Sequence, residues 1–571
     1  CRKSKAQNKV LKLSPWPRKL PLTGNLHNFI VSPPHYALRQ LAGEHVPLMH
    51  LQLGEISAIM VLSLSPRKYS TLAVRYQIKS KHIISFSLVC RRIKPQNKVK
   101  ELPPGPRKLP LIGNLHNLIG SLPHHALQQL AGEHGPLMHL QLGEISAIVV
   151  SSPRLAREVM QTHDLAFAQR PEILAPKIIS YGGSDIAFSP YGDYWRQMRK
   201  VCMLELLSAK RVKSFSSLRE EEISNLIESI HSSSGSPINF TKKIYSLTST
   251  IVCRAAFGTK CKDQDEFTLL ARESAALAGG FDIADLFPSK KFLHVVSGLK
   301  FKLEKIHGKV DKILDKIIND HRENPMSAET GKGELWKEDL VDVLLRLQQS
   351  GSLEFPITTN NIKAVILDMF AAGTDASSTV IDWAMSEMMR QPKVLEKAQA
   401  EIRQAFDGKK RIHEKDIQNL SYLKLVIKET LRLHPPVAML LPRECREPCE
   451  IDGYEIPLKT KVIVNAWAIG RDPALWHDAE SFIPERFTNS SIDFNGTQLE
   501  YIPFGAGRRM CPGITFGMAN IELPLAQLLY HFDWELPGRM RPEDLDMTEF
   551  FGAVVRRKNN LYLFAAPYSP S

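Results

Sequence analysis

Residues 504–513 read FGAGRRMCPG, and this stretch decides how the whole chain is interpreted. It fits the pattern F-x-x-G-x-R-x-C-x-G at every specified position. The glycines at 505, 507 and 513 predict a tight loop with φ values that other residues avoid. Such a loop directs backbone N–H groups at the Cys511 sulfur and tunes its donor strength. We therefore expect Cys511 to be a metal-ligating thiolate, whereas a lone cysteine is more often an inert core residue.

The neighbours of Cys511 support a haem site. Phe504 is expected to shield the thiolate from water, and Arg509 is placed to pair with a haem propionate. The helix expected over 514–530 brings its positive N-terminal end beside the sulfur. The segment resembles the haem-binding loop of the cytochromes P-450, the haem-thiolate monooxygenases. The resemblance implies haem b as the cofactor and Cys511 as its axial iron ligand.

The same resemblance predicts the fold. Residues 97–571 carry the family's motifs in the family's order, and we find no linker there that separates two cores. We therefore expect a mainly α, helix-rich triangular domain with small β-sheets. The catalytic domain is placed at residues 97–571.

Three more residues are expected to meet the haem. Trp195 and Arg199 fit W-x-x-x-R, and their i, i+4 spacing puts an indole N–H and a guanidinium on one helix face. A tryptophan stacked in the core is the alternative interpretation. Arg443 matches the family's strand arginine, which also meets a propionate.

A charge network is expected behind the haem loop. Glu429 and Arg432 lie at i, i+3 in a helical pattern over 422–433, so they share one helix face. Many solvated helices carry such a pair, so this signal alone is weak. The resemblance adds Arg486 and assigns all three residues to a buried structural network.

A long helix over about 360–390 carries the expected oxygen-binding stretch. Small residues at 372 and 373 leave room for O₂ beside the haem, and Thr374 lies within the same stretch. Asp375 is expected to feed protons inward. The family pattern has a threonine where this chain has Ala376, which predicts leakage of peroxide. Ser377, about 100° further round the helix, or a substrate hydroxyl is expected to replace it.

The N-terminal region repeats part of the domain. Residues 8–61 align with 97–150 at a constant offset, and 42 of the 54 positions are identical. Repeat architectures need at least three units, so two near-identical copies indicate a recent duplication. The spacer over 62–96 is basic and lacks helical and strand periodicity. We expect residues 1–96 to be a partial duplicate plus spacer, artefactual or disordered; a regulatory module is the alternative.

Charge, cysteines and hydropathy narrow the function further. Residues 1–108 hold 20 Lys and Arg against 3 Asp and Glu, a charge of +17, so the remaining residues carry −3 of the chain's net charge of +14. The positive charge therefore lies outside the folded domain, and no nucleic-acid partner is expected. Eight scattered cysteines suit a reducing compartment. Cys445 and Cys449 are spaced like half a zinc site, and no second such pair exists. No window reaches the ~18 apolar residues of a membrane span, so we expect an anchor missing upstream of Cys1.

The subgroup and its partners follow from resemblance. Residues 188–196 and 546–549 look like the plant A-type group, and the terpenoid oxidases of the premnaspirodiene oxygenase-like kind are the nearest resemblance. This implies an NADPH-cytochrome reductase as partner, O₂ and a small hydrophobic substrate, and the cytosolic face of the endoplasmic reticulum membrane. A haem-thiolate isomerase or dehydratase, and an inactive product of a duplicated gene, remain as alternatives.

Overall fold

The computed structural model describes most of the chain from residue 101 onward and three strands before it. Not described are residues 1–47, 54–55, 62–74, 78–100, 260–262, 280–281, 291, 294–296, 325–337, 410–411 and 570–571. The chain divides into two compact units. One comprises 1–99, 282–284 and 290–299, and the other comprises 100–281, 285–289 and 300–571.

The duplicated segment forms the same hairpin in both units. In the first unit β1 (Leu48–Leu53) pairs antiparallel with β2 (Ile56–Val61), and β2 pairs with β3 (Arg75–Gln77). In the second unit β4 (Leu137–Leu142) pairs with β5 (Ile145–Val150) in the identical register, shifted by the offset of the repeat. The three-residue β3 lies in the spacer, where no strand was expected.

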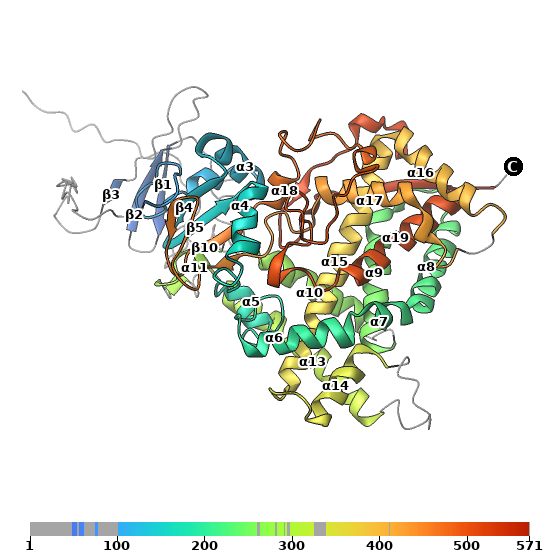
Figure 1. Cartoon of the computed structure of the whole chain (residues 1–571), viewed down its shortest axis with the longest axis horizontal. Coiled ribbons are helices and arrows are strands. Elements are labelled where there is room, and N and C mark those ends of the chain that lie inside the picture. Colours follow the sequence, from blue (N-terminus) through green and yellow to red (C-terminus); the bar gives the residue numbers. More distant parts are fainter. Residues whose placement is uncertain are drawn as a thin grey trace, which may run out of the picture. The chain divides into compact units, whose positions relative to one another are not determined.

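The described part of the second unit is rich in helices (Figure 1). The α-helices are α3 (Pro123–His134), α4 (Pro153–Arg157), α5 (Leu174–Ile179), α6 (Asp193–Val201), α7 (Ala209–Ser214), α8 (Ser216–His231), α9 (Phe240–Phe257), α10 (Gln264–Leu277), α11 (Ile283–Leu286), α13 (Leu299–Glu323), α14 (Leu340–Ser350), α15 (Thr359–Arg390), α16 (Pro392–Ala405), α17 (Ser421–Leu433), α18 (Ala466–Ile469) and α19 (Ile514–His531). Short 3₁₀ and π turns are η1 (Leu115–Leu118), η2 (Glu158–Thr162), η3 (Cys202–Leu206), η5 (Ile417–Asn419), η6 (Pro484–Phe487), η7 (Gly507–Arg509), η8 (Pro537–Arg539) and η9 (Pro542–Asp544).

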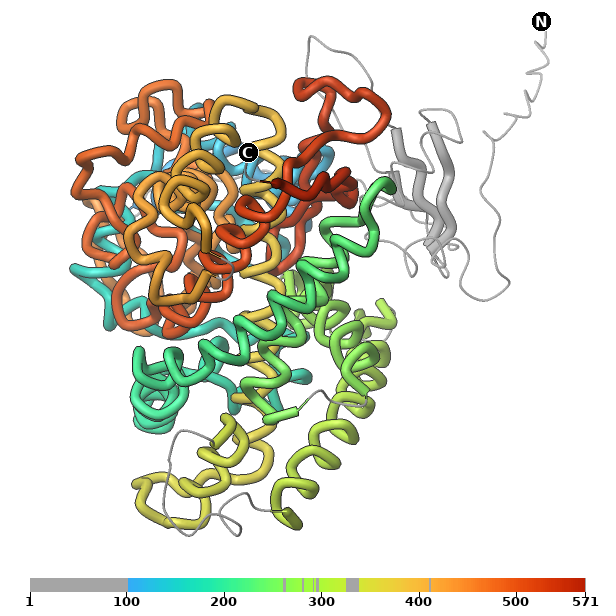
Figure 2. The backbone as a smooth tube through the Cα atoms, turned by 90° about the vertical axis from the view of Figure 1, so that its right-hand side faces the viewer, coloured from blue at the N-terminus to red at the C-terminus, as the bar shows by residue number. Residues whose placement is uncertain are grey.

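The long α15 organises these helices. Thr358 caps it in a reciprocal pair with Asn361, which satisfies orphan N–H groups of the first turn. The helix packs along α9 and against α19, and most of its side chains are buried. α13 and α14 lie side by side at one end of the helical body in both views (Figures 1 and 2). The helix expected over about 360–390 is confirmed.

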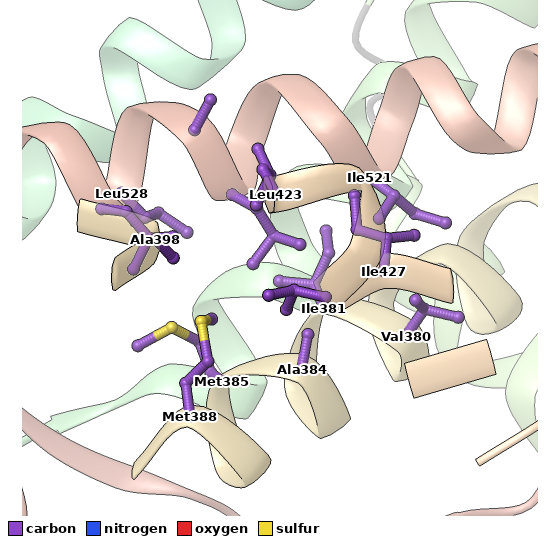
Figure 3. Close-up of a cluster of buried hydrophobic side chains, with 14 of the residues drawn as sticks. Val380, Ile381, Ala384, Met385, Met388, Ala398, Leu423, Ile427, Ile521 and Leu528 are labelled. Atoms are coloured by element: carbon purple, nitrogen blue, oxygen red, sulfur yellow. The ribbon is translucent and has the colours of Figure 1, made fainter. Parts of the chain in front are cut away.

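The largest apolar core lies where α15, α16, α17 and α19 meet. Val380, Ile381 and Met385 of α15 face Ile427 of α17 and Ile521 of α19 across this core (Figure 3). Burying side chains of this size stabilises the fold by about 1.5–3 kcal/mol each. The core fixes α19, which follows the loop of Cys511, against the central helix α15.

Small sheets complete the second unit. The four-stranded sheet has the order β4-β5-β10-β7, with β10 (Lys461–Val464) parallel to β5 and antiparallel to β7 (Arg443–Glu444). The other strands are β6 (Ile238–Asn239), β8 (Cys449–Ile451), β9 (Tyr454–Ile456), β11 (Phe532–Glu535), β12 (Glu549–Phe550), β13 (Arg556–Arg557) and β14 (Tyr562–Pro567). The expected mainly α fold with small sheets is confirmed.

One helix among the described residues is long and apolar enough to cross a membrane. This helix is α15, and 67% of its most apolar window is buried inside the protein. Its length and hydropathy therefore match its place in the core.

Candidate active site

Cys511 lies in the turn between η7 and the first residue of α19. Its own N–H donates to the Phe504 carbonyl at 3.0 Å, which closes the loop. The Gly513 N–H donates to the Cys511 sulfur. Burial raises the pKa of the Cys511 thiol, while the Gly513 hydrogen bond and the Arg199 charge oppose that rise. The loop thus holds the Cys511 sulfur next to the Gly513 N–H donor and the positive charge of Arg199.

The loop glycines do two different things. Gly505 and Gly507 have φ values of 71° and 68°, as expected for a left-handed turn. A Cβ on Gly507 would also lie 2.0 Å from the Met160 carbonyl oxygen. Gly513 has an ordinary φ of −94°, so the expectation of a special φ there is wrong. Gly513 instead precedes α19 and donates its N–H to the sulfur.

Phe504 is half-buried beside this loop. Its ring meets Phe494 edge-on at 5.2 Å between centroids and packs against the main core. Its role as a shield of the thiolate remains a prediction.

The arginines expected at the propionates gather around Trp195. Arg509 lies over the Trp195 ring at 4.2 Å and donates to the Ala168 and Ser189 carbonyls. The Trp195 indole N–H donates to the Ile186 carbonyl at 3.0 Å.

Arg199 and Arg443 connect this cluster directly to the cysteine loop. Arg199 donates to the Met510 carbonyl at 2.7 Å, one residue before Cys511. Arg443 is buried and donates to the Ala506 carbonyl at 2.8 Å and to the Asp164 carboxylate at 2.9 Å. The structure therefore brings Arg199, Arg443 and Cys511 together from three distant parts of the sequence.

A fourth arginine, Arg170, belongs to the same cluster, is buried and was not predicted. Its guanidinium donates to the carbonyls of Ala187, Leu441 and Pro442. Burial and the charges of Arg509 and Arg443 lower the pKa of Arg170. The only feature of the sequence that distinguishes Arg170 from other arginines is its position directly before Pro171.

The charge of this cluster fits a dianionic ligand. Burial, followed by the Arg443 charge, lowers the pKa of Arg509 to about 9. The carboxylates near the four arginines are Asp164 and Asp185, and burial raises the pKa of Asp185 to about 6. Like charges held together away from water are costly unless anions compensate them. Four arginines and two carboxylates leave two positive charges uncompensated, which a dianionic ligand such as a haem with two propionates would balance.

The central helix presents two different faces near this site. Ala372 is exposed and Ala376 is half-buried, and one helical turn separates them on a common face. Gly373 faces elsewhere: a Cβ there would lie 3.2 Å from Val252 of α9 and 3.5 Å from Phe516 of α19. The small residue at 373 therefore serves close helix packing, which corrects the expectation that it leaves room for O₂.

Asp375 and Thr374 line a small cavity on the side of α15 towards α10. Tyr245, Arg272 and Phe370 share its wall. Burial raises the pKa of Asp375, and the charges of Arg272 and Arg556 oppose that rise. The Thr374 hydroxyl is buried and has no hydrogen-bond partner among the described residues. Neither arginine was predicted from the sequence.

Ser377 lies away from the face of Ala372 and Ala376. It is 2% exposed, and a Cβ on Gly517 of α19 would lie 4.0 Å from its hydroxyl. Ala376 and Ser377 are consecutive residues, so their side chains point about 100° apart around the helix. The hydroxyl of Ser377 is thus placed towards α19.

An apolar hollow lies between the four-stranded sheet and the segment after α17. Its volume is about 70 Å³, and its wall is mainly apolar. Ile173 directly precedes α5, and Met439 and Leu440 lie between α17 and β7. The rest of the wall is Leu142, Ile145, Ala147, Gly279, Leu286, Pro442, Lys461 and Ile463.

The three residues of the expected charge network also lie together. Arg432 donates two hydrogen bonds of 2.7 Å to the Glu429 carboxylate, and Arg486 donates to the same carboxylate at 2.9 Å. Arg432 also donates to the Gly470 and Ala479 carbonyls, and both members of the central pair are fully buried. The network ties the end of α17 to the chain before the cysteine loop.

Comparison with known proteins gives one consistent answer. The family model described as cytochrome P450 matches residues 103–564. The chain belongs to the cytochrome P450 family. It is 58% identical to premnaspirodiene oxygenase from Hyoscyamus muticus over 86% of this chain and 97% of that protein. It is 61% identical to desmethyl-deoxy-podophyllotoxin synthase from Sinopodophyllum hexandrum, over 84% of this chain and 94% of that protein.

The structural comparison agrees with the family. A solved zebrafish cytochrome P450 with abiraterone matches with a TM-score of 0.66 at 25% identity, covering 78% of this chain and 99% of that one. The chain is therefore a haem-thiolate monooxygenase of the plant A-type, which acts on a small hydrophobic substrate with O₂ and a redox partner.

Proposed function

We propose that Cys511 is the axial ligand of the haem and that the four arginines Arg170, Arg199, Arg443 and Arg509 hold its propionates. When bound, the haem supplies the reductive activation of O₂ that inserts one oxygen atom into a C–H bond. The observation that carries this proposal is the joint geometry of the loop and the cluster. Arg199 and Arg443 bind the carbonyls of Met510 and Ala506, so the propionate cluster and the thiolate loop are one rigid unit.

The residues of α15 supply space and protons. Ala372 and Ala376 leave the face of the helix open beside the haem, because neither side chain extends beyond Cβ. Asp375 is buried next to Arg272 and Arg556, and burial raises its pKa, so it can hold a proton close to the site. Thr374, with an unpartnered hydroxyl in the same small cavity, is placed to pass that proton or to order a water.

The substrate we propose is a terpenoid hydrocarbon. The hollow beside Met439 and Leu440 is lined mainly by aliphatic side chains, which suits a ligand with few polar groups. Premnaspirodiene oxygenase and the germacrene A hydroxylase of Barnadesia spinosa, 57% identical over 81% of this chain, are named for such substrates. Incubation with NADPH, a reductase and a panel of terpenes tests this, and turnover of aromatic lignans alone would contradict it.

Electrons are proposed to come from an NADPH-cytochrome reductase at the endoplasmic reticulum membrane. The supporting observation is a basic patch on the cysteine-loop side, formed by Arg196, Lys200 and Arg508 with Arg446. Arg196 and Arg446 lie over the ring of Tyr191 at 5.7 and 5.2 Å, and Arg508 donates to its hydroxyl. Reversing the charge of Arg508 and Lys200 should slow electron transfer severalfold at low salt; an unchanged rate would contradict this docking face.

A haem-thiolate isomerase or dehydratase is the second candidate, because this chain has Ala376 where the family pattern has a threonine hydroxyl. Such an enzyme forms product without NADPH or O₂. Product that requires both excludes it, whereas product formed in their absence would replace the monooxygenase proposal. Residues 97–571 are proposed as the functional unit for either activity, since every site residue lies within them.

A further inference from the structure

One face of the four-stranded sheet forms a wall of the apolar hollow. Ile145 and Ala147 of β5 and Lys461 and Ile463 of β10 all line it. Each pair is two positions apart, and Ala147 is the neighbour of Lys461 in the parallel register, so these side chains leave the same face of the sheet. Lys461 is the one charged residue among the described residues that line the hollow.

The Lys461 ammonium has no fixed partner in the described part of the chain. No hydrogen bond or ion pair joins it to another described residue. Glu444, which lies opposite Lys461 on β7, accepts from the Lys459 ammonium at 2.8 Å. Asp285 accepts from the Leu174 N–H at 2.7 Å. Both nearby carboxylates are therefore engaged with other groups.

The position of Lys461 is costly without a hydrogen-bond acceptor. Its side chain is half-buried. Burial lowers the pKa of Lys461, and the charges of Asp285 and Glu444 oppose that fall. An ammonium has three N–H donors, and a donor withdrawn from water without an acceptor costs free energy. An oxygen atom in the hollow would accept from Lys461 and remove that cost.

The hollow has room for one end of a ligand. Its volume is about 70 Å³, whereas sites that enclose a whole small molecule are several times larger. Apart from Lys461 its wall is apolar, and it includes Leu286 and Leu440. A group that fits therefore combines carbon atoms with one accessible oxygen.

We propose that the hollow anchors the oxygen-bearing end of a terpenoid and that Lys461 selects this oxygen. The ammonium donates to a hydroxyl, carbonyl or carboxylate oxygen, and the apolar wall contacts the carbon atoms beside it. The inference rests on the proposed terpenoid substrate and adds a second ligand class, a terpenoid skeleton that already carries one oxygen. A terpenoid hydrocarbon binds without this contact.

Equilibrium dialysis of the full chain with haem tests the selection. The probes are farnesene, farnesol and farnesoic acid, which share one carbon skeleton and differ at one end. In an apolar site without a polar partner, the added oxygen lowers affinity. We expect the opposite order, with farnesol and farnesoic acid bound about tenfold more tightly than farnesene. A larger gain for the acid supports an ion pair and an equal gain supports a hydrogen bond, whereas equal or tighter binding of farnesene would overturn the proposal.

Lys461→Met tests whether Lys461 makes the selection. Methionine fills a similar apolar volume without a donor, so the tenfold advantage should vanish while the affinity for farnesene stays within about twofold. Lys393→Met, which removes an exposed lysine of α16, should keep the wild-type order. An advantage that survives in Lys461→Met would overturn the role of Lys461. If none of the three ligands binds the wild type, the proposed terpenoid substrate is wrong, and this inference falls with it.

Thermal unfolding tests whether the protein itself satisfies the ammonium. Lys461→Met should unfold at the wild-type temperature or higher, because no hydrogen bond is lost and methionine packs against the apolar wall. A fall of several degrees would show that Lys461 has a partner within the protein, which would contradict the proposal.

Discussion

Among single residues, the largest functional effect is expected from Ala376, which stands where the family pattern has a threonine. The family's threonine hydroxyl is replaced by a methyl group on the half-buried face of α15 that it shares with Ala372. The nearest hydroxyl in sequence, Ser377, is placed beside Gly517 of α19. Proton delivery beside a bound haem is therefore expected to depend on Asp375, water or the substrate, and some loss of peroxide is expected.

Ala376→Thr is expected to improve the coupling of NADPH oxidation to product. The added hydroxyl orders water on the open face of α15, so the peroxide released per NADPH should fall severalfold. Peroxide and product are measured together in the reconstituted enzyme. Ser377→Ala is the matched control and should change neither quantity, because its hydroxyl points towards α19. An unchanged coupling in Ala376→Thr would show that water or substrate already delivers the proton.

Sequence motifs predicted the residues with a distinct spacing and missed those without one. Cys511, Arg199 and Arg443 were predicted from motifs, and the structure brings them together. Arg170, Arg272 and Arg556 carry no spacing signal, because three distant segments deliver them to their sites. Gly373 and Gly513 show the opposite failure: the residue type was noticed, but its reason, helix packing or an N–H donor, depends on neighbours that only the fold supplies.

At the scale of elements, charge pairs fix how neighbouring helices and loops meet. Glu429 of α17 holds Arg432 on its own helix and Arg486 of η6, and it also accepts the Ile483 N–H. Removing one partner of a buried pair leaves the other without compensation. The network therefore controls the stability of the chain that leads to the cysteine loop.

Glu429→Gln is expected to lower the free energy of unfolding by about 3–5 kcal/mol, because the Arg432 guanidinium then stays buried without its carboxylate. Urea titration followed by circular dichroism measures the loss. Arg486→Lys serves as the control: it keeps a charge near Glu429 from a less buried position, and a loss well below that of Glu429→Gln is expected. Equal losses would show that the buried pair is not the centre of the network.

The contact between α13 and α14 makes stability depend on pH. The His321 imidazole bonds the Asp339 carboxylate at 2.8 Å and the Ile317 carbonyl at 2.7 Å. Burial disfavours the charged ring, but Asp339 outweighs burial and raises the pKa of His321 to about 9. The folded protein thus holds a proton that the unfolded chain releases near its ordinary pKa of 6.5.

The His321–Asp339 contact adds up to about 3 kcal/mol to the free energy of unfolding. This contribution is fully present below pH 6.5 and is lost as the pH rises through 9. Denaturant titrations between pH 6 and 9.5 measure the loss. His321→Gln should flatten the profile, and so should Asp339→Asn, which keeps an N-cap side chain on α14. A steep profile in both variants would assign the pH dependence to other groups.

At the scale of the whole molecule, the helical unit carries every residue of the site, and the N-terminal repeat carries none of them. β1 and β2 reproduce the register of β4 and β5, so the duplicated sequence forms the same local hairpin. Only the second copy is continuous with the rest of the catalytic unit. The order of motifs along the sequence indicates residues 97–571 as the catalytic domain, and this boundary stays a prediction.

Deleting residues 1–96 is expected to leave the activity of the anchored protein unchanged. No site residue is lost, and β4, β5, β7 and β10 form their sheet entirely from later segments. Product formation per haem, compared between residues 97–571 and the full chain on the same anchor, measures this. A large loss on deletion would instead assign the repeat a regulatory role.

The difference spectrum of the reduced protein with carbon monoxide tests the central claim most directly. If Cys511 is the thiolate ligand, residues 97–571 on an anchor should give a strongly red-shifted Soret band. Cys511→Ser should lose that band, whereas Cys202→Ser, a change at another buried cysteine, should keep it. An unshifted band in the wild type, or a red-shifted band that survives in Cys511→Ser, would contradict the assignment of Cys511 to the iron.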